Sequence, residues 1–423
     1  MNKKWTLVVA FALFSLFFGA GNLILPPQLG FKSGEIWWLV ALGFSLSAVL
    51  IPILGILAHA KLQGTLFDFG KKVSPTFSLV YCYLVYAISI SLPSPRTASV
   101  THEMAIQPFF ASSSWLTSGV YFLLVFIFVM NRSRILDIIG KILTPAMVLV
   151  LVSIISIATV TLGAPNGISS FPSPFTHAIL EGYQTFDAIG SVVVGGVIII
   201  SLNLKHPTAS YAEKKRTIAQ AGMLAGLGLF LVYGGLIYAG ALHQNVFDAD
   251  ISRTQLLQSI SVSTLGNIAN AFLTVLVSIA CFTTAVGIVT GTADFVKGRF
   301  QDSNTAYLIT AILGCVLGVL MGQFNVGYII QVALPALMFI YPITIVLILL
   351  NVLPEKYASP NVFRWVVLVT IIFSIPDFLG SLGYGETIAP FTSWIPLREF
   401  HMGWVLPAVV AFALAQRIPP QNN

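Results

Sequence analysis

Charged side chains are scarce in this sequence. They make up 9% of its 423 residues, whereas a soluble domain carries about a quarter, and this excludes an ordinary soluble protein. Cysteine is also rare, and Cys82, Cys281 and Cys315 all lie inside apolar segments, so no disulfide framework is predicted. The six histidines are scattered with no pair at metal-ligand spacing, which is typical of interfacial or loop residues.

Apolar side chains are abundant instead. Hydrophobic residues make up 57% of the chain and fall into twelve segments, each near the roughly 20 residues that a helix needs to cross a bilayer. The sequence therefore predicts an all-α polytopic membrane protein in a lipid bilayer. No nucleic-acid partner is expected, because the basic residues lie in short loops. The twelve segments lie at 5–30, 36–59, 76–95, 116–131, 140–162, 178–203, 217–242, 265–292, 305–322, 326–350, 363–379 and 402–417.

The basic residues predict the orientation. With the N-terminus in the cytoplasm, only Lys32, Arg96, Arg253 and Arg398 fall outside, and the other 17 of the 21 lysines and arginines fall inside. Cytoplasmic loops carry this excess of Lys and Arg in membrane proteins, so both termini are predicted to be cytoplasmic. Two outer connections are long enough to fold, as an external gate or as surface loops, at 96–116 and 243–264.

The first segment is interrupted in its middle. Gly19-Ala20-Gly21-Asn22 is a poor helix interior, and Pro26-Pro27 interrupts the segment again. Unwound backbone at membrane depth is tolerated where it faces protein or a water-filled cavity, and its freed amides and carbonyls can bind ions. We interpret this stretch as half of a substrate site. Glycines that let another helix pack closely, or a secretory signal, are the alternatives.

A second interruption is predicted in the sixth segment, because inverted repeats place broken helices at matching positions. The stretch EGYQTFDAIG, from Glu181 to Gly190, holds two glycines, several polar groups and a carboxylate. Asp187 is its most informative residue, since an ionisable group inside a span is costly and usually faces a cavity or a partner. If the span starts later, Asp187 lies at an outer interface instead.

The eighth segment offers oxygen atoms. Thr283 and Thr284 lie near its middle, and hard cations such as sodium take oxygen ligands. Threonines in helices more commonly bond the carbonyl one turn back. The two threonines therefore indicate a cation site only if a broken helix lies beside them.

The chain also resembles a known family. The motifs FFGAGNLILPPQLG and GYQTFDAIGS, with the twelve-segment layout, resemble the bacterial branched-chain amino acid:cation symporter family over nearly the whole chain. This family looks like a member of the broader amino acid–polyamine–cation superfamily, whose fold is the five-plus-five inverted repeat of the bacterial leucine transporter. The resemblance implies one transmembrane domain, with repeats at 1–163 and 176–350 and two further helices at 360–417.

The resemblance also implies site residues. The first motif matches the Gly-X-Gly-Asn of the unwound point, and the eighth segment matches an Ala-x-x-Thr-Ser sodium pattern, with Thr in place of the final Ser. Asp187 departs from a small polar residue, which leaves the number of ions open. The implied substrate site consists of Ala20, Gly21, Asn22, Tyr183, Thr185, Phe186 and Asp187. The implied sodium site consists of Ser15, Phe18, Ala280, Thr283 and Thr284.

The predicted function is sodium-driven import of leucine, isoleucine and valine by alternating access across the bacterial inner membrane. Sodium is co-transported, and no organic cofactor is expected. An apolar pocket separates chains that differ by one methylene by only about 1–3 kcal/mol, which favours broad selectivity. The alternative is proton coupling through Asp187. The sequence holds no catalytic motif such as HExxH and no repeated filter, which argues against an enzyme or a channel, and it predicts no oligomeric state.

Overall fold

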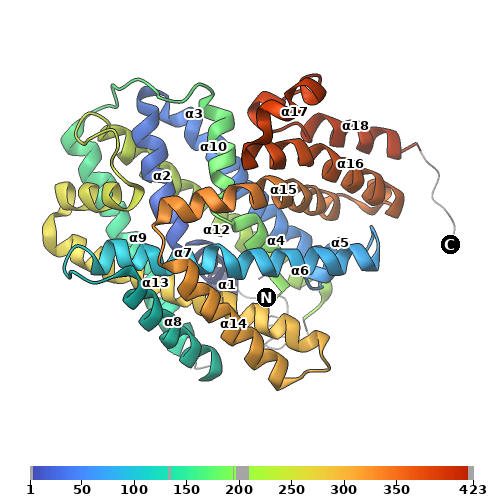
Figure 1. The fold of residues 1–423 in the computed structure, drawn as a ribbon, viewed down its shortest axis with the longest axis horizontal. Coiled ribbons are helices and arrows are strands. Elements are labelled where there is room, and N and C mark those ends of the chain that lie inside the picture. The colour runs from blue at the N-terminus through green and yellow to red at the C-terminus, as the bar shows by residue number, and fades with distance from the viewer. Residues whose placement is uncertain (1–2, 132–134, 194, 197–208, 418–423) are drawn as a thin grey trace.

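The computed structural model describes residues 3–131, 135–193, 195–196 and 209–417, and these residues form helices, turns and loops without a strand (Figure 1). The predicted all-α class is therefore confirmed for the described chain. The longer helices are α1 Lys3–Phe17, α2 Ala20–Ser33, α3 Trp37–Ser45, α4 Ile51–Leu62, α5 Leu66–Gly70, α6 Pro75–Ser91, α7 Pro93–Thr101, α8 Ser114–Asn131, α9 Ile135–Leu162, α10 Pro174–Tyr183, α12 Tyr211–Leu242, α13 Arg253–Arg299, α14 Asn304–Gly322, α15 Val326–Val352, α16 Pro360–Leu379, α17 Gly385–Thr392 and α18 Val405–Ala415.

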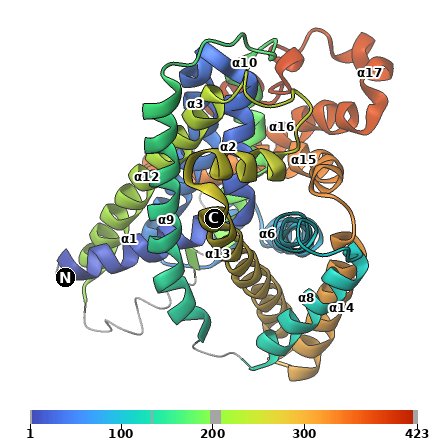
Figure 2. The ribbon, with the colours of Figure 1, turned by 90° about the vertical axis from the view of Figure 1, so that its left-hand side faces the viewer.

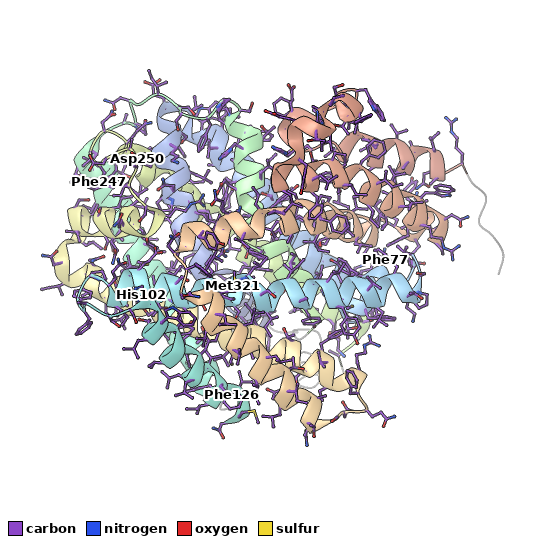
Figure 3. The ribbon with its side chains drawn as sticks, viewed as in Figure 1. Phe77, His102, Phe126, Phe247, Asp250 and Met321 are labelled. Atoms are coloured by element: carbon purple, nitrogen blue, oxygen red, sulfur yellow. The ribbon has the colours of Figure 1, made fainter. Side chains whose placement is uncertain are left out.

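Helices long and apolar enough to cross a membrane dominate the fold. Nine such stretches occur among the described residues, and two shorter apolar helices, Trp5–Ser15 and Val405–Ala415, accompany them. Large apolar side chains cover the outside: Leu123, Met223 and Leu313 are each at least 60% exposed. Figure 3 shows side chains projecting all around the outside of the molecule. Such a surface suits hydrocarbon rather than water, and the count of twelve spans stays a prediction.

The centre of the fold is the broken first helix, α1 and α2, packed along α12 (Figure 2). A methyl group on Gly30 of α2 would collide with the carbonyl of Ile237, and one on Gly240 of α12 would collide with the carbonyl of Pro27. Glycine lets the two backbones meet at these points, as in many membrane helix pairs. The close-packing alternative therefore applies to Gly30, outside the predicted unwound stretch.

The third span is longer than predicted. Helix α6 is followed directly by α7 and by a π-helical turn, η3 (His102–Ile106), so residues 75–106 form one nearly continuous helical rod. The prediction of an outer connection that begins at Arg96 is wrong, because Pro93 starts α7 in the first helical turn, where proline is tolerated. Only the stretch 107–113 connects this rod to α8.

The second predicted connection is folded as well. Helix α13 begins at Arg253, where Ser252 and Gln255 form a capping box. Gly266 has a φ of 80°, which a glycine adopts without strain, and there the chain changes direction before the eighth span continues. The segment 253–265 is thus a separate helix leading into the span.

Loops assigned to one side of the membrane meet in the structure. The Lys61 amine donates to the carbonyl of Asn351 at 3.1 Å, the Lys72 amine donates to that of Ala358 at 3.4 Å, and Arg364 Nε donates to that of Val73 at 3.1 Å. These contacts join the loops after α4, α5 and α15, which the basic residues place inside. The loop at 204–216 falls partly outside the described residues.

The last helices lie at one corner of the molecule. Helices α16, α17 and α18, in red in Figure 1, follow α15; α16 packs against α15, and α17 and α18 pack against α16. The proposed repeats at 1–163 and 176–350, with the added 360–417, stay a prediction.

Candidate functional site

The first helix breaks between Phe17 and Ala20. Phe18 and Gly19 are not helical, and Gly19 is extended, with φ −93° and ψ 175°. The predicted break is present but shorter than expected, because Ala20, Gly21 and Asn22 already form the first turn of α2. The Asn22 backbone amide donates to the carbonyl of Gly19 at 3.1 Å, so the amides of Ala20 and Gly21 are the ones at the positive end of the helix dipole that a helix start leaves without intrahelical partners. The break therefore presents amide donors to whatever lies beside it.

Pro26 and Pro27 do not interrupt the chain again. Both lie inside α2, which runs on to Ser33, so that part of the prediction is wrong. Membrane helices tolerate interior prolines because neighbouring helices compensate for the lost hydrogen bonds. Here the backbone of Pro27 packs directly against Gly240 of α12.

The sixth span also breaks, after Tyr183. Gln184 and Thr185 form a turn, Phe186 has a φ of 62°, and a helix resumes at Asp187. A positive φ is an outlier for a bulky residue and persists only where its surroundings enforce it. The Thr185 hydroxyl does so by donating to the carbonyl of Gly182 at 2.8 Å and accepting from the amide of Asp187 at 3.2 Å.

Asn22 joins the two breaks. Its side-chain amide nitrogen lies 2.6 Å from Oδ2 of Asp187 and 2.6 Å from the hydroxyl of Tyr233, and it also contacts the carbonyl of Phe17. An amide group has two hydrogens, so it can bond only two of these three oxygens at once. Asp187 is 6% exposed. The alternative that placed Asp187 at an outer interface is therefore wrong.

Arg96 and Tyr233 belong to this site although no sequence pattern predicted them there. Arg96 lies on α7 and is 5% exposed, although it was predicted to lie in an outer loop. Its Nη1 donates to the carbonyl of Gln184 at 2.7 Å, and its guanidinium carbon lies 5.4 Å from the centre of the Phe186 ring. A methyl group on Gly21 would collide with its Nη2. Arg96 therefore touches both broken helices.

The predicted pocket residues divide into two groups. Gly21, Asn22, Phe186 and Asp187 lie around Arg96, as described above. The ring of Tyr183 stacks instead on that of Tyr341, with centroids 4.3 Å apart, and the Thr185 hydroxyl is used within the break. Ala20 lies in the first turn of α2, next to Gly21.

One of the predicted sodium residues on α13, Thr284, faces Gly19. The hydroxyls of Thr283 and Thr284 both donate to the carbonyl of Ala280, at 3.0 and 2.8 Å, which is the ordinary arrangement for helical threonines. Thr284 Oγ1 nevertheless lies 3.8 Å from the position of a methyl group on Gly19, so it faces the break in the first helix.

On the first helix, Ser15 is half-buried in the last turn of α1, and Phe18 is buried in the break. The ring of Phe18 packs against those of Phe14 and Tyr233, with centroids 5.0 and 6.3 Å away. A helix end leaves its last carbonyls without intrahelical partners, so this end of α1 is a source of oxygen ligands.

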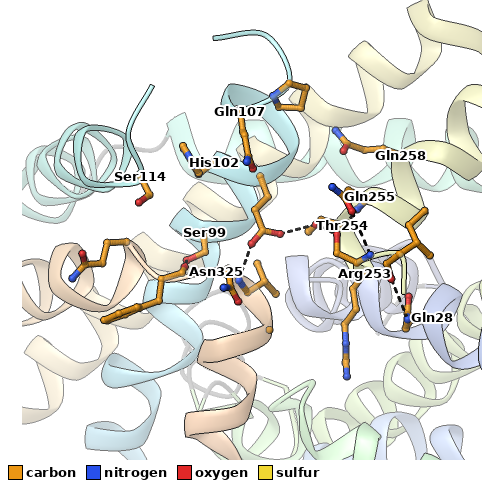
Figure 4. A pocket seen from close by; sticks show the side chains of 18 residues that line it. Gln28, Ser99, His102, Gln107, Ser114, Arg253, Thr254, Gln255, Gln258 and Asn325 are labelled. Atoms are coloured by element: carbon orange, nitrogen blue, oxygen red, sulfur yellow. Dashed lines mark hydrogen bonds between the residues drawn. The ribbon is translucent and has the colours of Figure 1, made fainter. Parts of the chain in front are cut away.

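A polar cavity of about 890 Å³ lies beyond the breaks (Figure 4). Glu103 is one of the residues that line it, and its carboxylate accepts hydrogen bonds from the hydroxyl of Thr254 at 2.6 Å and from the amide of Val326 at 2.8 Å. Arg253, on its wall, forms a two-point ion pair with Glu181 at 2.9 and 3.3 Å. These contacts tie the start of α13 to η3, α15 and α10. The residues that surround Arg96 do not line this cavity.

Known proteins resemble this chain over nearly its whole length. A family model described as branched-chain amino acid transport protein matches residues 2–421. The branched-chain amino acid transport system 2 carrier protein of Pseudomonas aeruginosa is 31% identical over 417 residues, covering 97% of this chain and 94% of that protein. The branched-chain amino acid permease BraB of Bacillus subtilis is 31% identical over 436 residues, covering 99% and 97%.

A solved structure shares the fold. The inward-facing conformation of Mhp1 superimposes with a TM-score of 0.63 at 12% identity, covering 97% of this chain and 90% of that one. At this identity the likeness shows the fold alone. It confirms the predicted leucine-transporter-like fold.

Proposed function

Because this chain belongs to the branched-chain amino acid transport protein family, we propose that it imports leucine, isoleucine and valine with sodium ions by alternating access. The family moves its substrate rather than converting it, and the chain is a multi-pass membrane transporter and not an enzyme. The observation that carries the proposal is the 2.6 Å contact between Asn22 and Asp187, which joins the two helix breaks.

The geometry supports an amino-acid site at this junction. The first turn of α2 offers amides to a carboxylate, and the carboxylate of Asp187 suits a cation or a substrate ammonium group. Buried apolar rings, Phe18 and Phe186, lie beside these polar groups and suit an aliphatic side chain. Counterflow of labelled leucine in proteoliposomes, with and without sodium, tests the proposal. Failure of sodium to raise uptake at fixed pH would reject sodium coupling.

Proton coupling is the second candidate. Within the described chain, no basic nitrogen lies within 4 Å of the Asp187 carboxylate, although it accepts a hydrogen bond from Asn22. A buried carboxylate without an ion pair is suited to carry a proton. Uptake that depends on a pH gradient and ignores sodium would favour this candidate.

We expect Thr284→Ala to raise the sodium concentration for half-maximal uptake about tenfold. The change removes an oxygen that faces the break at Gly19, and the loss of one interaction with a desolvated cation is worth roughly 1.5 kcal/mol. Leucine uptake measured against sodium concentration tests this. Thr284→Ser keeps the oxygen and should have a small effect.

The matched control is Thr292→Ala, farther along α13. The Thr292 hydroxyl donates to the carbonyl of Ile288 at 2.8 Å, so its removal costs the same kind of back-bond away from the break. Its sodium dependence should stay normal. Equal shifts in both variants would attribute the effect to helix structure rather than to sodium.

The proposed orientation, with both termini in the cytoplasm, is tested by thiol labelling. On a background without the three native cysteines, Lys215→Cys should resist a membrane-impermeant reagent in intact cells, and Asp250→Cys should react. Both native side chains are exposed, so burial does not decide the outcome. The reverse pattern would invert the topology.

A further inference from the structure

Arg96 is a buried cation that forms no direct ion pair within the described chain, although the carboxylate of Asp187 attracts it from beyond 4 Å. A guanidinium group stays charged in proteins and has five N–H donors. Among the described residues, no carboxylate oxygen lies within 4 Å of it; its guanidinium donates to the carbonyl of Gln184 and lies over the face of Phe186. An unpaired charge inside a membrane protein is costly and marks a functional position. This arrangement suits an anion that bonds the guanidinium directly, which no described carboxylate does.

The position of the guanidinium indicates which anion. Its Nη2 lies against Gly21, the second residue of α2, in the first helical turn and at the positive end of the helix dipole. The flat fork of a guanidinium matches the two oxygens of a carboxylate. Gly21 has no side chain to separate the fork from these amides. A carboxylate placed here accepts hydrogen bonds from both the guanidinium and the amides.

A negative charge, the carboxylate of Asp187, meets the next residue of α2. Asn22 follows Gly21 and contacts the carboxylate of Asp187. The junction therefore holds a positive group against Gly21 and a negative group against Asn22. An α-amino acid carries its two charges on groups attached to one carbon atom, so a site with one group of each sign on neighbouring residues of α2 suits a zwitterion.

We propose that Arg96 binds the carboxylate of the transported amino acid, together with the first-turn amides of α2. This inference rests on the proposed function and names the group that selects free α-amino acids over their amides and esters. A ligand without a carboxylate leaves the guanidinium buried and unpaired. The free-energy cost of leaving Arg96 unpaired, rather than contacts with the ligand's side chain, excludes such ligands.

The test compares leucine with leucinamide, which keeps the ammonium group and the side chain but has no carboxylate. Thermal stabilisation of the purified full-length protein gives the apparent affinity for each ligand. We expect the wild type to prefer leucine about 100-fold, the range for hydrogen bonds to charged groups. In Arg96→Gln the two affinities should lie within about threefold, through loss of leucine affinity alone.

Two further variants make the result decisive. Arg96→Lys keeps the charge but not the forked guanidinium, and its preference for leucine should lie between those of the wild type and Arg96→Gln. It decides the question if Arg96→Gln does not fold. Arg253→Gln removes the guanidinium paired with Glu181, and it should keep the wild-type preference.

The outcomes separate this inference from the proposed function. An unchanged preference in Arg96→Gln, or equal wild-type affinity for leucine and leucinamide, would overturn the role of Arg96 while leucine uptake stands. Wild-type protein that takes up no leucine would reject the proposed function itself.

Discussion

Gly21→Ala is expected to lower leucine uptake by about 100-fold while the protein still folds. The added methyl group would collide with the guanidinium of Arg96, which is the far end of a flexible side chain and can move away. The fold therefore accommodates the change, but the guanidinium and the first-turn amides of α2 no longer converge. Uptake into proteoliposomes and the melting temperature of the purified protein measure the two effects separately.

The matched control is Gly30→Ala, the same substitution in the same helix. There the methyl group would meet the backbone carbonyl of Ile237, which cannot rotate away as a side chain does. We expect a loss of stability of about 3 kcal/mol, from overpacking between α2 and α12, and a lower melting temperature. If Gly21→Ala also melts early and keeps wild-type leucine affinity, Gly21 is a packing glycine and the carboxylate binds elsewhere.

Asp187→Asn is expected to reduce concentrative leucine uptake by about 100-fold or more. The substitution keeps the shape and an oxygen that can accept from Asn22, but it removes the negative charge at the second break. Losing a buried charged partner costs about 2–5 kcal/mol, of which about 2.8 kcal/mol corresponds to 100-fold. Initial rates of labelled leucine uptake measure the effect.

Exchange experiments then separate the roles of Asp187. If Asp187 binds the substrate ammonium group, the substitution should abolish uptake and leucine–leucine exchange together. If Asp187 carries a proton instead, the substitution should abolish concentrative uptake and spare exchange. Asp377→Asn, at another buried aspartate on α16, is the matched control and should transport normally. Wild-type uptake in Asp187→Asn would remove this carboxylate from the mechanism.

The sequence alone predicted an all-helical membrane protein and two of the places where its helices break. These features depend on local chemistry: a span needs a minimum apolar length, and glycine next to polar groups weakens a helix wherever it lies. The breaks at Phe18-Gly19 and at 184–186 were predictable for that reason. Their exact limits were not, because the neighbouring helices decide whether Pro26 and Pro27 are tolerated.

Only the tertiary structure decided which groups meet at the breaks. Asn22 and Asp187 are 165 residues apart, and Arg96 lies 88 residues from Gln184, so no local pattern pairs them. Arg96 also follows two prolines at the end of an apolar run, which is typical of a span that has ended. It lies inside because α7 continues the helix of α6, and this continuation places its charge against Gly21. Packing between distant helices, rather than the composition of any one of them, brings these charges to one point.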